Sequence, residues 1–266
     1  MMQQDTNKDL GQHWLNDREA LNSIITLADI SPSDTVLEIG PGLGSLTRLL
    51  VEKAGQVVAV EVDDLLIDRL KSRFANQSKV EIVSQDIRNY NLSLLPPNYK
   101  CVANIPYYLT SYLIRLLSQS TNQAKVVVLL VQREVVERIT AKPGKMSILA
   151  VTAQAYWLVE LGPIIRAELF NPPPKVDSRI IKMIRRDASL TPQGLEKEFM
   201  QIVKIGFSQK RKTLLNSLSA GLNKDKLTIR TILTKVGLNS NIRAQSLSLD
   251  EWNKLTIEIF KNQTIK

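Results

Sequence analysis

The chain has 266 residues, 44% of them hydrophobic, which is enough for one large domain or two smaller ones with a sizeable core. Its single cysteine, Cys101, excludes an internal disulfide framework and a cysteine metal cluster, and its one histidine leaves few ligands for metal-dependent chemistry. The net charge of +9 suits a polyanionic partner, whereas the longest apolar run, residues 126–131, is too short to span a membrane.

In chain order, helical patterning at residues 19–28 precedes a series of valine-rich runs. Strands are predicted near residues 35, 57, 80, 100 and 125, and they alternate with helices near residues 46, 64, 110 and 133. Such alternation indicates a parallel sheet with helices on both faces. Beyond residue 145, β-rich runs at 148–159, 164–170 and 179–184 are expected to form closing antiparallel strands.

A turn at residues 189–192 is the natural boundary between domains, because only helical spacing follows it. Helices are predicted at residues 194–206, 211–220, 226–236 and 249–260. We therefore predict an α/β domain over residues 1–188 and a small all-helical domain over residues 189–266. The excess positive charge is uneven: residues 1–186 carry 22 Lys and Arg against 19 Asp and Glu, and residues 187–266 carry 13 against 7.

A glycine motif, Glu38-Ile39-Gly40-Pro41-Gly42-Leu43-Gly44, follows the first predicted strand and precedes a helix. Its glycines let the chain turn sharply and let a ligand approach bare backbone at the carboxyl edge of a parallel sheet. The even spacing of the glycines differs from the G-x-G-x-x-G pattern of dinucleotide-binding proteins. The motif also lacks the lysine of a phosphate-binding loop, which argues against a triphosphate ligand.

Two acidic residues follow the next predicted strands. Glu61 ends the run at residues 57–60, about twenty residues after the glycines, where a carboxylate can accept hydrogen bonds from both hydroxyls of a ribose. Asp86 follows the run at residues 80–83 and is placed to accept from an adenine amino group. Either acid alone is more often a solvated strand end or a helix cap, but together with the glycine motif they predict one adenosine site.

Asn104-Ile105-Pro106-Tyr107 lies where the next strand should end and a helix begin. The Asn104 side-chain oxygen and a carbonyl fixed by the rigid Pro106 can both accept hydrogen bonds from an exocyclic amine, while Tyr107 can stack on the attached base. A plain strand-to-turn corner is the alternative interpretation of so short a motif. The adenosine site predicted upstream favours the interpretation that this motif holds an exocyclic amine.

Three motifs together resemble the ribosomal RNA adenine dimethyltransferases, a family of class I S-adenosylmethionine-dependent enzymes. They are Gly11-Gln12-His13-Trp14-Leu15, Asn104 to Tyr107, and Asn171-Pro172-Pro173-Pro174-Lys175-Val176-Asp177-Ser178. The similarity extends from about residue 8 to Trp252. The resemblance implies a Rossmann-like sheet that binds S-adenosyl-L-methionine and dimethylates two adjacent adenosines in the 3′-terminal hairpin of 16S ribosomal RNA during late small-subunit assembly.

The resemblance also implies roles for individual residues. It assigns cofactor binding to His13, Leu15, Gly40, Gly42, Glu61, Asp86 and Asn104, with the adenine at Asp86 and the ribose at Glu61. It assigns catalysis to Asn104, Pro106 and Tyr107. The family usually has Asn-Phe where this chain has His13-Trp14, so the contact assigned to that position is the one this sequence leaves open.

Two basic segments are candidates for RNA binding. Lys175 and Arg179 follow the three prolines, whose rigid extended loop could form a basic lip beside a flipped base. Lys210, Arg211 and Lys212 are predicted to start a helix, and a similar run in the family favours contact with RNA phosphates. The alternative interpretations are a rigid connector between strands and a solvated helix start.

We therefore expect a cytoplasmic, monomeric enzyme that acts on small-subunit RNA in a pre-30S particle, without a metal ion and without a membrane. Two alternatives remain. The related branch that modifies 23S RNA usually begins its first motif with Ser in place of Gly11. A non-catalytic ribosome assembly factor would have no need of the intact glycine and Asn104 motifs.

Overall fold

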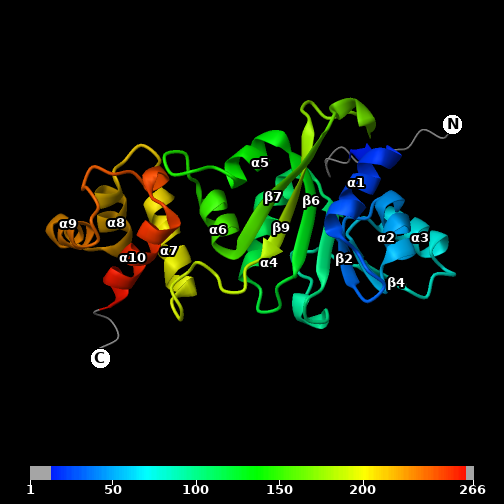
Figure 1. The fold of residues 1–266 in the computed structure, drawn as a ribbon, viewed down its shortest axis with the longest axis horizontal. Helices are drawn as coiled ribbons and strands as arrows, with labels where there is room; N and C mark the ends of the chain where they lie inside the picture. The colour runs from blue at the N-terminus through cyan, green and yellow to red at the C-terminus, as the bar shows by residue number, and fades with distance from the viewer. Residues whose placement is uncertain (1–12, 262–266) are drawn as a thin grey trace. The chain divides into compact units, whose positions relative to one another are not determined.

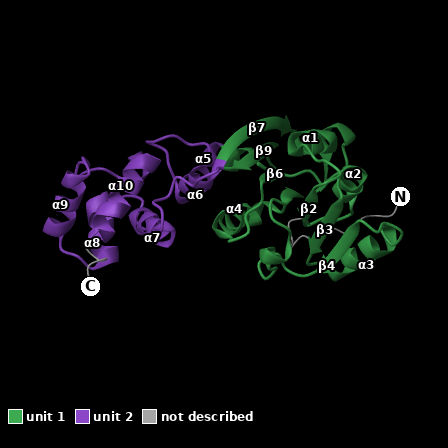
Figure 2. Ribbon diagram, turned by 60° about the horizontal axis from the view of Figure 1, so that its bottom comes forward, with its two compact units in different colours: residues 1–136, 158–185 green, residues 137–157, 186–266 purple. Residues whose placement is uncertain are grey.

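The structure is a computed structural model that describes residues 13–261 (Figure 1). The described chain forms two compact units, one of residues 13–136 and 158–185 and the other of residues 137–157 and 186–261, coloured separately in Figure 2. Within residues 13–261, no helix combines the length and the apolar character that crossing a membrane requires.

The first unit contains a mixed seven-stranded sheet, as expected for an α/β fold, with strand order β4-β3-β2-β5-β6-β9-β7. The strands are β2 (Thr35–Ile39), β3 (Gln56–Glu61), β4 (Val80–Ser84), β5 (Lys100–Asn104), β6 (Val126–Gln132), β7 (Trp157–Ile165) and β9 (Ser178–Arg185). The first five of these are parallel, and β9 pairs antiparallel with β6. The predicted alternation is confirmed by α1 (Arg18–Ala28), α2 (Ser45–Lys53), α3 (Asp64–Arg73), α4 (Thr110–Gln119) and α5 (Arg133–Ile139).

Both faces of the central strands are buried, because neighbouring residues of a strand point to opposite sides and both sets have almost no exposed surface. On one face, Val36, Val102 and Val128 pack with Ile24 of α1 and Leu50 of α2 in one apolar cluster. Since this core fixes the parallel strands in register, their carboxyl ends lie along one edge of the sheet.

A two-stranded ladder lies apart from the main sheet. β1 (Trp14–Leu15) pairs antiparallel with β8 (Phe170–Asn171), so that Trp14 lies opposite Asn171 and Leu15 opposite Phe170. Leu15 and Phe170 are both buried and belong to the same apolar cluster as α1. The ladder therefore joins the N-terminal segment to the segment that precedes the prolines.

The prediction of a strand at residues 148–159 is wrong for most of that range. Residues Ile148–Tyr156 form helix α6, capped by the Ser147 side chain, which accepts from the Ala150 amide, and β7 begins only at Trp157. Seven of the helix's nine residues are buried. A helix buried on nearly all sides has no polar face, so its sequence lacks the 3.6-residue periodicity that would have distinguished it from a strand.

The second unit is helical and contains α6, α7 (Glu196–Phe207), α8 (Leu214–Leu222), α9 (Lys226–Lys235) and α10 (Leu249–Phe260) (Figure 2). Trp252 and Phe199 are fully buried in it. Gly206 allows close packing, since a Cβ there would lie 2.5 Å from the Trp252 ring. This unit also includes residues 137–157, whereas each predicted domain consists of one continuous stretch of the chain. The domain boundary at residue 189 stays a prediction.

The predicted start of the helix at residues 211–220 needs correction. Lys210, Arg211 and Lys212 lie in a turn, and α8 begins at Leu214 with Thr213 as its N-cap. The physical reason is that threonine is a favoured N-cap, whereas positive charges in the first turn oppose the helix dipole.

Candidate functional site

A cavity of the first unit opens at the carboxyl edge of the parallel strands. Its wall is formed by the segments that directly follow β2, β3, β4 and β5, together with the N-terminal segment that contains β1. The predicted cofactor residues all contribute to the lining: His13, Leu15, Gly40, Gly42, Glu61, Asp86 and Asn104. Gly11, which the first motif also contains, lies outside the described residues.

The glycine motif adopts a conformation that other residues would resist. Gly40, Gly42 and Gly44 have φ angles of +65°, +58° and +77°, in the left-handed region. A Cβ on Gly42 would lie 2.3 Å from Trp14 Cζ3, so the indole ring packs directly on this backbone. A Cβ on Gly40 would have no neighbour within 4 Å. Of these two glycines, therefore, Gly40 is the one that leaves open space beside the backbone for a ligand.

Glu61 ends β3 and is 7% exposed. Its Oε2 accepts from the Gly42 amide at 3.1 Å, and its Oε1 accepts from the Val62 and Asp63 amides at 2.9 and 3.1 Å. Burial raises the pKa of Glu61 even though these three donors favour the ionised form. Because a carboxylate has about four acceptor sites, Glu61 holds the glycine loop and still has room for a further donor.

Glu38, the penultimate residue of β2, is the most deeply buried acid of the cavity wall, with 1% of its surface exposed. Burial, together with the nearby Glu61 carboxyl, raises the pKa of Glu38 to about 8. Its Oε2 accepts no hydrogen bond from the residues that the structure describes. The sequence placed Glu38 before the first glycine, as one of three acids at successive strand ends that predict the adenosine site, but it assigned Glu38 no contact with the ligand.

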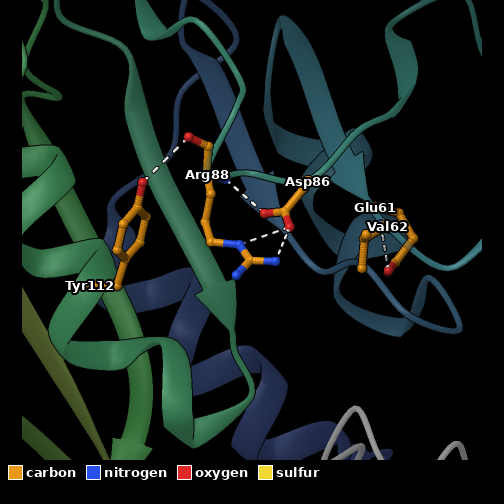
Figure 3. Close-up of polar contacts among 5 residues, drawn as sticks. All are labelled: Glu61, Val62, Asp86, Arg88 and Tyr112. Atoms are coloured by element: carbon orange, nitrogen blue, oxygen red, sulfur yellow. Dashed lines mark hydrogen bonds and ion pairs between the residues drawn. The ribbon is translucent and has the colours of Figure 1, made fainter.

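Asp86 follows β4 and forms an ion pair with Arg88 (Figure 3). Its Oδ1 accepts from the Arg88 amide at 2.8 Å, and its Oδ2 accepts from Nε and Nη2 of the same residue. The guanidinium holds the pKa of Asp86 below its usual value. The Arg88 carbonyl in turn accepts from the Tyr112 hydroxyl at 3.3 Å. Nothing in the sequence signalled that Arg88 would pair with the predicted adenine acceptor.

The Asn104 motif lies where β5 ends. Asn104 is half-buried at the cavity wall, and Tyr107 begins a short 3₁₀ turn. The Pro106 carbonyl already accepts from the Leu109 amide at 3.0 Å as part of that turn. The Asn104 side chain makes no hydrogen bond to a described residue, so its amide oxygen is available to a ligand.

Three motifs that are distant in the sequence meet around Tyr107. The Tyr107 hydroxyl is 2.8 Å from Ser178 Oγ, at the end of the proline-rich motif. Its ring stacks on His13 of the N-terminal motif, with centroids 5.9 Å apart and planes 24° apart. His13 Nδ1 donates to the Pro172 carbonyl at 2.8 Å. The sequence did not predict the contacts that His13 and Ser178 make.

The predicted RNA-binding residues occupy different environments. Lys175 is exposed, whereas Arg179 is half-buried and its Nε donates to the Gly162 carbonyl at 2.9 Å. Lys210, Arg211 and Lys212 are exposed in the turn before α8, and among the described residues none of them forms an ion pair. Their contact with RNA stays a prediction.

The cavity wall suits S-adenosylmethionine. Three carboxyl groups, from Glu38, Glu61 and Asp86, line a space beside the open face of Gly40. The ionised acids of this wall favour a ligand that carries positive charge, as a sulfonium and an α-ammonium do, and they oppose a phosphate. Among residues 13–261, no cluster of His, Cys, Asp and Glu has a geometry that could hold a metal ion.

Comparison with known proteins gives a consistent result. The family model described as ribosomal RNA adenine dimethylase matches residues 3–261. A protein of Dehalococcoides mccartyi named "Ribosomal RNA small subunit methyltransferase A" is 40% identical over 258 residues, which cover 96% of this chain and 89% of that protein.

Two solved structures are similar over nearly their whole length. A dimethyladenosine transferase from Plasmodium falciparum has a TM-score of 0.79 and 28% identity, and the match covers 95% of this chain and 99% of that one. The 23S rRNA methyltransferase ErmE has a TM-score of 0.71 and 26% identity, covering 92% of this chain and 98% of that one.

Glu38 makes the stability of the protein depend on pH. Because its pKa is raised from 4.5 to about 8 in the folded protein, the folded state holds a proton that the unfolded chain releases between these values. The free energy of unfolding therefore falls as the pH rises through this window. We expect Glu38→Gln, which cannot ionise, to gain stability relative to the parent as the pH rises from about 5 to about 8.

Urea denaturation at a series of pH values would measure this difference. Glu52→Gln, at an exposed position of α2, is the matched control and should show a difference that stays constant with pH. A constant difference for Glu38→Gln as well would mean that Glu38 is ionised in the folded protein.

Proposed function

The chain belongs to the ribosomal RNA adenine dimethylase family, and from this premise we propose that its cavity serves the S-adenosylmethionine-dependent dimethylation of the 6-amino group of adenosines in 16S ribosomal RNA. One observation carries the proposal. The acid-lined wall suited to a cationic methyl donor and the Asn104 motif suited to an exocyclic amine lie in the same cavity.

The residues of the wall have separable tasks in this proposal. Asp86 and Glu61 bind the adenine amino group and the ribose of the cofactor, and the open backbone at Gly40 lets the nucleoside approach closely. S-adenosylmethionine, when bound, supplies an activated methyl group with its own leaving group, so that no strong base is required. Proximity and alignment are then the main sources of acceleration.

Asn104 and Tyr107 present the acceptor. The lone pair of an adenine 6-amino group is delocalised into the ring, so the amine must become pyramidal before it attacks. The Asn104 amide oxygen, which accepts no hydrogen bond from residues 13–261, accepts from the amine and favours that change, together with the Ile105 or Pro106 carbonyl. Tyr107 stacks on the extruded base. A site that tolerates one methyl group can present the remaining hydrogen for a second transfer.

We further propose that the substrate is a pair of neighbouring adenosines in the 3′-terminal hairpin, met in a pre-30S particle in the cytoplasm by a monomeric enzyme. Unpaired loop bases are the cheapest to extrude, which supports a hairpin loop as the target. The small-subunit relative favours 16S RNA over the 23S RNA that ErmE acts on.

Reverse transcription across both ribosomal RNAs, from strains with and without this protein, tests the substrate. Dimethylated adenine cannot form a normal base pair, so extension should stop at two neighbouring adenosines of the small-subunit RNA only when the protein is present. A stop in large-subunit RNA alone would assign the protein to the branch that modifies 23S RNA. The same pattern of stops in both strains would favour a non-catalytic assembly factor.

Asn104→Ala should separate chemistry from binding. Since the contacts of Asn104 strengthen as the amine becomes pyramidal, we expect turnover to fall by about a hundredfold while the affinities for cofactor and RNA are retained. Methyl transfer to unmethylated small subunits and calorimetric titration with S-adenosylhomocysteine measure the two properties. Gln119→Ala, which removes an exposed amide at the end of α4, is the control. A variant that methylates at the parental rate would refute the role of Asn104.

The basic turn before α8 gives a prediction about salt. Replacing Lys210, Arg211 and Lys212 together by Gln should weaken RNA binding and flatten its log–log salt dependence by about 0.7 to 0.9 per lost phosphate contact. Cofactor affinity should not change. The control replaces Lys197, Lys226 and Arg230, three exposed basic residues on helices of the same unit, with the same loss of charge. Equal slopes in both triple variants would mean that the turn has no special contact with RNA.

A further inference from the structure

Tyr107 has two contacts that constrain its ring in different ways. The hydroxyl oxygen lies on the axis about which the ring rotates, so its 2.8 Å hydrogen bond with Ser178 holds the tip of the side chain. That bond leaves the ring free to rotate about the axis. The plane of the ring depends instead on the groups that lie against its faces, and the imidazole of His13 stacks there, with ring centroids 5.9 Å apart.

His13 is itself held in place. Its Nδ1 is 2.8 Å from the Pro172 carbonyl, which can only accept, so the proton lies on Nδ1 and the ring orientation is determined. The following residue, Trp14, pairs with Asn171 in the β1–β8 ladder and packs on the Gly42 backbone. The imidazole therefore has a rigid support on both the N-terminal and the proline-rich side.

We propose that His13 is a positioning residue that fixes the ring plane of Tyr107 to receive the target adenosine. The inference rests on the proposed function, in which Tyr107 stacks on the extruded base. His13 covers one face of the tyrosine ring, so the base stacks on the opposite face and its plane follows that of Tyr107. Because methyl transfer requires the amine to be aligned with the methyl group, a rotated ring slows transfer even when both substrates are bound.

Substitutions at His13 can separate its stacking from its hydrogen bond. His13→Phe keeps an aromatic ring but loses the bond to the Pro172 carbonyl, whereas His13→Asn keeps an N–H donor but loses the ring. His13→Ala loses both. Asn16→Ala removes a different contact of the same segment, the 3.1 Å hydrogen bond from Ser45, and serves as the control.

The measurement is methylation of unmethylated small subunits, with kcat and both KM values determined separately. We expect His13→Ala and His13→Asn to lower kcat by about tenfold at saturating cofactor and RNA, while His13→Phe and Asn16→Ala stay within about threefold of the parent. The KM for S-adenosylmethionine should change by less than about threefold in all of these variants.

Other results would overturn the proposal. If His13→Asn, which carries the residue usual in the family, keeps the parental kcat and His13→Phe raises only the KM for S-adenosylmethionine, His13 contacts the cofactor and does not position Tyr107. If all His13 variants keep the parental kcat, the stack has no role in transfer. An unmodified protein that transfers no methyl group would instead refute the proposed function, so the two failures are distinguishable.

Discussion

The common carboxyl edge of the parallel strands is the constraint on which the site depends. β2, β3, β4 and β5 are parallel and in register, so the segments that follow them emerge side by side. The end of each strand contributes one part of the site: the glycine loop after β2, Glu61 at the end of β3, Asp86 after β4 and Asn104 at the end of β5. A buried apolar core holds the strands together, and the distances between the strands set the distances between the functional groups at their ends. The polar residues therefore need little structure of their own to lie within reach of one ligand.

Burial of carboxyl groups at this edge is unfavourable in the free protein. Glu61 is compensated by three backbone amides and Asp86 by Arg88, but one oxygen of Glu38 has no hydrogen-bond partner within the described part of the chain. Desolvation raises the pKa values of Glu38 and Glu61, and a neighbouring carboxyl adds to the rise in each case: Glu61 for Glu38, and Asp63 for Glu61. A positively charged ligand beside these carboxyl groups would favour their ionised forms and so offset the cost of burying them.

The sequence predicted the parts of the molecule that depend on local patterns. Continuous apolar runs are typical of strands buried on both faces, and such runs located β2, β3 and β6. Glycines and acids placed after such runs located the cavity wall. The helix α6 was missed because its surroundings are apolar on nearly every side, which removes the periodic signal. The pairing of Arg88 with Asp86 and the stack of His13 on Tyr107 depend on side-chain positions that no local pattern encodes.

The β1–β8 ladder has a consequence for the order in which the protein forms during synthesis. The hydrogen bond between His13 and Pro172 joins residues 159 positions apart, so the N-terminal wall of the cavity lacks this bond and its β8 partner until the segment after β7 has been translated. The strands β2 to β6 can meet earlier, as soon as each leaves the exit tunnel. A nascent chain interrupted before Phe170 would thus hold the glycine loop and the acids but lack one side of the pocket. Completion of the binding site is in this way tied to completion of the first unit.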